Sequence, residues 1–196
     1  MSIIIEFWLT VVCLLGEKVE LLISNKGIQK VNYELIKTAS QFERVITLLN
    51  ESRAIGIDSE TTGLDPFTSR LHLLQIAIPE RVYIIDLFRT PDLIKTLFRL
   101  FQTERPTKIF HNAKFDLKML SHHYGIKVNG IFDTMLASQL IACGSVGERH
   151  SLNDVLQSFL GVGIEKGEQG SDWSTENLTQ DQLEYAALFC IMQQEE

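Results

Sequence analysis

Cysteine is scarce in this sequence, and no two cysteines stand at metal-binding spacing. The three cysteines, Cys13, Cys143 and Cys190, are odd in number and form no CxxC motif. This pattern argues against a disulfide framework and against a cysteine-based zinc site. It favours a reducing compartment, and we expect a cytoplasmic location.

Basic residues are also in short supply. Lys and Arg number 18 against 25 Asp and Glu, which gives a net charge of −7. Phosphate contacts favour basic surfaces, so this balance argues against tight binding of duplex nucleic acid. It does not exclude an enzyme that holds the end of a single nucleic-acid strand. Metal ions in such an enzyme act locally, and the acids that bind them add to the negative charge.

The sequence has no internal repeat, no low-complexity tract and no run long enough to span a bilayer. The stretch from Ile3 to Leu15 is apolar but is interrupted by Glu6 and Thr10, and neither Lys nor Arg precedes it. It is too short for a membrane span and lacks the flanks of a signal peptide. We therefore expect residues 1–30 to be an apolar extension of unknown role, with no membrane partner, and residues 31–196 to form one domain.

Hydrophobic periodicity predicts an α/β fold with a mixed β-sheet flanked by helices. The expected strands are 33–36, 54–60, 71–78, 82–86 and 107–110, with a shorter one near 130. Helices are expected after Ser40 (with Glu43 in a capping box), Thr90, Asn112, Thr134, Ser151 and Thr179. Three strands in a row followed by alternating helices and strands are typical of such a sheet.

Asp58 and Glu60 are the most informative residues of the chain. They stand at the end of the buried strand predicted over 54–60, one residue apart. Residues i and i+2 of a strand share a face, so both carboxylates should point the same way. Two acids held together in this way repel each other and lose solvation unless a proton or a cation compensates them. The pair therefore predicts a divalent metal site.

Two further segments carry residues of the same kind. Asn112 is predicted to cap a helix in which Asp116 follows one turn later, and Phe132-Asp133-Thr134 comes next along the chain. Near the end, Thr179 and Gln182 form a capping box that opens a helix carrying Tyr185-Ala186-Ala187.

This ordered set resembles the DEDD superfamily of 3′-5′ exonucleases, in the tyrosine branch that includes ribonuclease D and the proofreading domain of family A DNA polymerases. The residues that match its three motifs are Asp58, Glu60, Thr62 and Gly63, then Asn112 and Asp116, then Tyr185, Ala186 and Ala187. The resemblance extends from about Tyr33 to Leu188 and implies the ribonuclease H-like fold.

The resemblance also implies a reaction, its cofactors and its substrate. It implies hydrolysis of phosphodiester bonds at the 3′ ends of single-stranded DNA or RNA, with two Mg²⁺ or Mn²⁺ ions. Asp58 would bridge the ions, Glu60 would bind the first and Asp116 the second, while Tyr185 would orient the attacking water. The residues implied in substrate binding are Thr61, Leu64, Asn112 and Phe115; core packing is an equal alternative for Phe115.

The third motif departs from the family. A Tyr-x3-Asp spacing is expected there, but the position four residues after Tyr185 is Phe189, and Glu184 faces another side of the helix. The resemblance therefore predicts a weakened first metal site, and an exonuclease domain that is incomplete at its C-terminus. A decayed exonuclease that only binds strand ends is the main alternative. A phosphatase of the haloacid dehalogenase type is a second, because Asp58-x-Glu60-x-Thr62 loosely resembles its nucleophile motif.

Overall fold

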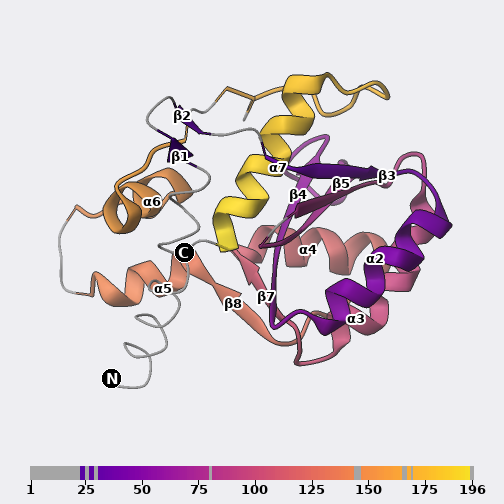
Figure 1. Cartoon of the computed structure of the whole chain (residues 1–196), viewed down its shortest axis with the longest axis horizontal. Coiled ribbons are helices and arrows are strands. Elements are labelled where there is room, and N and C mark those ends of the chain that lie inside the picture. Colours follow the sequence, from indigo (N-terminus) through magenta and orange to yellow (C-terminus); the bar gives the residue numbers. More distant parts are fainter. Residues whose placement is uncertain are drawn as a thin grey trace.

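The computed structural model describes residues 23–24, 27–28, 31–79, 81–143, 147–164, 167–168 and 170–194. Its main feature is a six-stranded sheet in the order β3-β6-β5-β4-β7-β8 (Figure 1). These strands are β3 (Tyr33–Ile36), β4 (Ala54–Thr61), β5 (Leu71–Ile78), β6 (Arg81–Asp86), β7 (Thr107–Phe110) and β8 (Ile131–Asp133). A separate two-stranded sheet pairs β1 (Ile23–Ser24) with β2 (Gly27–Ile28).

The main sheet is mixed, as the sequence predicts. The central pairs β4–β5 and β5–β6 are antiparallel, whereas β3–β6, β4–β7 and β7–β8 are parallel. The predicted strands agree with the observed ones to within one residue at each end, and the short strand expected near 130 is β8. The prediction for residues 1–30 lies outside the described residues except for β1 and β2.

Helices cover both faces of this sheet. They are α2 (Ala39–Glu51), the 3-10 helix η1 (Pro91–Leu97), α3 (Phe98–Gln102), α4 (Ala113–Tyr124), α5 (Thr134–Ile141), α6 (Leu152–Leu160) and α7 (Gln180–Gln194). In Figure 1, α7 crosses one face, whereas α2, α3 and α4 lie on the other. Helix α7 contacts β4, β5 and β6, which makes it the cover of the central strands on its side.

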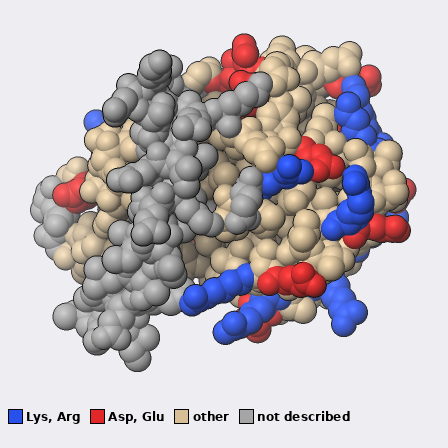
Figure 2. Space-filling model, in the orientation of Figure 1, with Lys and Arg blue, Asp and Glu red and all other residues tan. Residues whose placement is uncertain are grey.

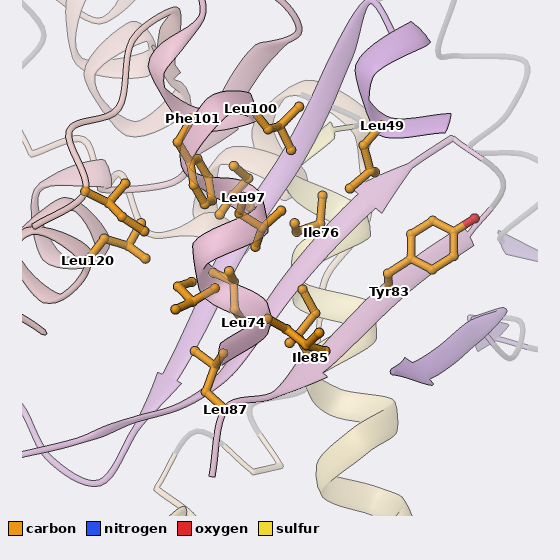
Figure 3. Packing of buried hydrophobic residues seen from close by; sticks show 14 of the residues in the cluster. Leu49, Leu74, Ile76, Tyr83, Ile85, Leu87, Leu97, Leu100, Phe101 and Leu120 are labelled. Carbon is orange, nitrogen blue, oxygen red and sulfur yellow. The ribbon is translucent and has the colours of Figure 1, made fainter. Parts of the chain in front are cut away.

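An apolar core fills the space between the sheet and α2, η1, α3 and α4. Ile55 and Ile57 of β4 and Leu74 and Ile76 of β5 are buried there. Figure 3 shows Leu97 beside Leu74 and Ile76 in this core. These strand positions alternate along the chain, so their side chains all point to this face. The core on this side is thus built mainly of apolar side chains.

The opposite face carries a second cluster beneath α6 and α7. Leu73 and Ala77 of β5 and Ile84 of β6 are buried against Ala186 and Ile191 of α7. The thiol of Cys190 on α7 contacts the carbonyl oxygen of Gly56, 3.5 Å away. Since Gly56 has no side chain, α7 can pack directly on the backbone of β4 at this point.

Two of the predicted helix starts differ by one or two residues, and the cap predicted at Asn112 is in place but makes no side-chain bond. The first helix begins at Ala39, because Thr38 is extended and its hydroxyl accepts the N–H of Gln41 at 3.2 Å, so Ser40 lies inside the helix. Asn112 adopts the left-handed conformation, with φ of 65°, and its side chain makes no capping bond. Asp133, not Thr134, caps α5 through the N–H of Met135.

The capping box predicted at the start of α7 is confirmed. The hydroxyl of Thr179 accepts the N–H of Gln182 at 3.2 Å, and the side chain of Gln182 accepts the N–H of Thr179 at 2.9 Å. This reciprocal pair sets where α7 begins. It therefore fixes which residues of α7 face the sheet.

Charged side chains of both signs are interspersed on the face of the molecule shown in Figure 2, mostly on the side of α2 and α3. None of the helices in the described ranges has both the length and the apolar character that a bilayer crossing needs. The apolar stretch from Ile3 to Leu15 lies outside those ranges.

Candidate active site

Asp58 and Glu60 lie on the face of β4 that α7 covers. Ile55 and Ile57 point to the apolar core on the other face, so the alternation of β4 turns both acids toward α7. The charges of Glu60 and Asp58 raise the pKa of Tyr185 on α7, after the larger effect of its burial. The predicted shared orientation of the two acids is thus confirmed, and Tyr185 lies within their field.

Asp116 reaches this region from α4, on the other side of β4. Its buried carboxylate accepts a hydrogen bond from the hydroxyl of Ser59, the residue between the two acids. Ser59 points away from α7 because it alternates with Asp58 and Glu60. The strand thus presents two carboxylates on one face and holds the third from the other.

The three carboxylates disfavour one another's ionisation. Burial raises the pKa of Asp58 to about 6, against smaller opposing effects of hydrogen bonds from the Ser59 backbone and the Gln193 side chain and of nearby His111. Burial also raises the pKa of Glu60, and the charges of Asp58 and Asp116 add to this rise. Burial raises the pKa of Asp116 as well, with a further contribution from Asp58. The cluster therefore holds protons unless a cation takes their place.

The chemistry of this donor set fits a divalent cation. Carboxylate oxygens are the ligands that Mg²⁺ and Mn²⁺ prefer, and none of the ion pairs between described residues gives these acids a Lys or Arg partner. As the side chains stand, no three His, Cys, Asp or Glu residues in the described ranges are close enough together to hold a metal ion. Repulsion between the carboxylates and the hydrogen bond that holds Asp116 to Ser59 are consistent with this separation.

Tyr185 and Phe189 stand one turn apart on α7 and contact each other. Their ring centroids are 4.4 Å apart, and the ring of Trp173 lies 6.4 Å from that of Tyr185. Both rings are half-buried. Phe189 therefore faces the acid cluster together with Tyr185, but its ring offers no oxygen ligand.

A cavity of about 480 Å³ opens beside Asp58. It is formed mainly by α5, by the start of α6 and by the last turns of α7, and its lining residues are Asp58, His111, Asn112, Met135, Gln139, His150, Ser151, Leu152, Asn153, Phe189 and Gln193. Asn112 is exposed here, next to the acids. The predicted substrate residue Asn112 thus shares one cavity with the predicted metal ligand Asp58.

Two of the remaining predicted substrate residues, Thr61 and Leu64, follow Glu60 directly in the chain. The hydroxyl of Thr61 donates to the carbonyl oxygen of Gly63 at 2.7 Å, and the N–H of Arg70 donates to the Thr62 hydroxyl at 2.9 Å. These bonds hold the loop on which Leu64 is 83% exposed. Phe115 is half-buried and packs against the apolar core, as expected from the alternative assigned to it.

Sequence reasoning missed two side chains that the structure brings to the acids. Ser59 could have been predicted, because the residue between two acids that share one face of a strand must point to the other face, which here is covered by α4. Gln193 stands one turn after Phe189, is 2% exposed and hydrogen-bonds to Asp58. A glutamine at that spacing belongs to no motif, so only the helical repeat from Tyr185 and Phe189 indicates it.

The sequence was compared with known proteins. A 3′-5′ exonuclease family matches residues 33–191. DNA polymerase I of Aquifex aeolicus is 39% identical over 157 residues, which cover 80% of this chain and 25% of that protein. The chain thus spans about a quarter of the length of this curated relative.

Solved structures show the same fold. NrnC of Brucella melitensis is similar with a TM-score of 0.64 and 32% identity, covering 83% of this chain and 76% of that one. The Trypanosoma brucei RNase D complex with RNA U12 gives a TM-score of 0.76 at 23% identity, covering 91% of this chain and 64% of that one. The predicted ribonuclease H-like architecture is therefore confirmed.

Proposed function

The chain belongs to the 3′-5′ exonuclease family, and from this premise we propose that it hydrolyses phosphodiester bonds one nucleotide at a time from 3′ ends. The observation that carries the proposal is the group of three carboxyls Asp58, Glu60 and Asp116 on and beside β4, whose raised pKa values mean that they ionise together only when a cation compensates them. We propose Mg²⁺ or Mn²⁺ as the cation, since the donor atoms are carboxylate oxygens.

Each residue has a role that its position supports. Asp58 and Glu60 would hold the cation from the α7 face, and Asp116 would do so from α4 after release from Ser59. When bound, the metal would act as a Lewis acid and lower the pKa of a bound water. Tyr185 would position the attacking water through its hydroxyl, because its raised pKa keeps the phenol protonated.

The cavity beside Asp58 and the exposed Leu64 would hold the last nucleotides of the strand. Asn112 would contact the substrate from the cavity wall, and Thr61 would contact it beside Glu60. We propose single-stranded DNA or RNA as the substrate, in line with RNA U12 in the Trypanosoma RNase D complex and pGG bound to the Brucella protein. The net charge of −7 agrees with weak duplex affinity. Free Cys143 and Cys190 support a reducing, cytoplasmic location.

Phe189 favours a second candidate function. An aromatic ring in place of an acid weakens the hold on one cation, so we propose an impaired nuclease. At the limit, the chain would bind strand ends without cleaving them. The phosphatase alternative is dropped, because the family match extends across the segments that carry all three exonuclease motifs.

The test is a digestion of a 5′-labelled single-stranded oligonucleotide in Mn²⁺ by the wild-type chain and two variants. We expect a ladder of shortened products, loss of the ladder in Asp58→Asn, and no change in the control Asp92→Asn, whose carboxylate lies on the surface in η1. Cuts within a circular substrate would contradict the proposed reaction. Binding of the oligonucleotide without any ladder would favour the decayed module.

A further inference from the structure

Gln193 lies in the same cavity wall as Phe189 and Asp58. It stands one helical turn after Phe189 and two turns after Tyr185, so α7 brings a polar side chain to Asp58 where the family position brings a ring. Its side chain hydrogen-bonds to the Asp58 carboxylate. Among the described residues of α7, it is thus the polar side chain in direct contact with the acid cluster.

The side-chain oxygen of Gln193 is buried and has no hydrogen-bond partner. Leaving a buried acceptor unpaired costs about 1–3 kcal/mol, so a native site with such an atom calls for an explanation. An amide that donates its N–H to a carboxylate keeps its oxygen available for another partner. Rotation of the terminal amide would present this oxygen to a cation bound by Asp58.

Gln75 of β5 is a second buried amide beside Asp58. It pairs directly with Asp58 in the β4–β5 register, shares its face, and is fully buried with neither side-chain atom hydrogen-bonded. The region beneath the end of α7 thus contains one carboxylate and two carboxamides with unpaired atoms. Such a group is costly in an apolar core and is suited to a polar or cationic occupant.

We propose that Gln193 supplies the oxygen ligand from α7 to the divalent cation held by Asp58, in place of the carboxylate that Phe189 lacks. This inference rests on the proposed function. Rotation of the terminal amide by about 180° exchanges its nitrogen and oxygen, and this brings the oxygen to the side of Asp58. Carboxamide oxygens bind hard cations but carry no full charge, so the site retains a reduced affinity.

The experiment measures Mn²⁺ affinity by titration calorimetry on the full chain without nucleic acid. Gln193→Met removes the oxygen at similar volume and should weaken Mn²⁺ binding roughly 10- to 100-fold. Gln193→Glu adds a charged oxygen at the same position and should strengthen it. The matched control is Gln180→Met on the same helix, where Gln180 is exposed and donates to Glu184, and Mn²⁺ affinity should stay unchanged.

A double-mutant cycle sharpens the assignment. If Phe189→Asp restores a carboxylate from α7, then Gln193→Met should cost less Mn²⁺ affinity in that background than in the wild type. Equal losses in the two backgrounds would mean that Gln193 acts on Asp58 independently of the missing ligand, and would overturn the proposal.

Failure of this inference is distinguishable from failure of the proposed function. Loss of Mn²⁺ binding in Asp58→Asn together with wild-type affinity in both Gln193→Met and Gln193→Glu would overturn the role of Gln193 and leave the metal site standing. Wild-type affinity in Asp58→Asn would remove the metal site itself. Should Gln193→Met fail to fold, Gln193→Glu decides alone: unchanged or weaker Mn²⁺ binding in it overturns the proposal.

Discussion

The two faces of the sheet use the same strands but bury different groups. Beneath α2, α3 and α4, Ile55, Ile57 and Leu74 pack against other hydrocarbon side chains. Beneath α7, the alternate residues of those strands include Asp58, which is partly buried and has a raised pKa, and Gln75, which is fully buried with unpaired polar atoms. Alternation thus lets β4 turn apolar side chains to one face and Asp58 and Glu60 to the other, while Ser59 holds Asp116 from the apolar side. The stability of the first face offsets the cost of the second.

Substitutions on the apolar face should change the free energy of unfolding most. Ile57→Ala removes a fully buried side chain from the core beneath α2 and α4, and should lower the free energy of unfolding by about 2–5 kcal/mol. Urea denaturation measures this loss. Ile131→Ala, at a position on β8 that is 41% exposed, serves as the control and should change stability little. A loss below about 1 kcal/mol at Ile57 would mean that this face contributes less than its burial indicates.

The next effect concerns the chemistry of the other face. Phe189→Asp places a carboxylate one turn after Tyr185, and should raise exonuclease activity roughly 10- to 100-fold, the range associated with gain or loss of a metal-site partner. The measurement is the rate of shortening of a 5′-labelled oligonucleotide in Mn²⁺. If the wild-type chain already works at ordinary exonuclease rates and Phe189→Asp leaves the rate unchanged, Phe189 occupies no ligand position.

Gln75→Leu tests whether the polar face is costly to the fold. The substitution removes two buried side-chain atoms without partners and should raise the free energy of unfolding by about 1 kcal/mol, opposite in sign to Ile57→Ala. Urea denaturation in EDTA reports the change. A loss of stability instead would indicate that an ordered water pairs with the amide.

The cost of the polar face should also appear in the pH dependence of stability. Because the folded chain raises the pKa of Asp58 to about 6, it binds this proton more tightly than the unfolded chain does. Metal-free stability should therefore be greatest below the unfolded pKa near 4, and decrease as the pH rises through about 6. Asp58→Asn should raise the metal-free Tm at pH 8 by about 2–4 °C and leave it nearly unchanged at pH 4. Equal shifts at both pH values would contradict the assignment.

The smallest expected effect is at the exposed rim. Leu64→Ala should raise KM for a single-stranded oligonucleotide about threefold to tenfold with kcat unchanged, through loss of apolar contact with the terminal nucleotide. Leu48→Ala on α2, also an exposed leucine, is the matched control and should leave KM alone. Melting temperatures of both variants should remain close to that of the wild type.

Sequence reasoning succeeded where short-range periodicity determines geometry. The alternation of β4 predicted that Asp58 and Glu60 share a face, and the Thr179–Gln182 capping box predicted the start of α7. It failed in part at the first turn of α4, where Asn112 holds the predicted cap position but the hydrogen bonds come from a carboxylate that follows the whole of that helix in the chain. Contacts of this kind depend on the packing of distant segments, which no local pattern encodes.

That carboxylate belongs to Asp133, which accepts the N–H groups of Asn112 and Ala113 as well as those of Met135 and Leu136. One side chain therefore joins the first turns of α4 and α5. Helix α5 contributes Met135 and Gln139 to the cavity wall, and α4 carries Asp116. Asp133 thus fixes the cavity wall and the helix that carries the third acid to the same strand end, so a substitution at Asp133 should disturb both.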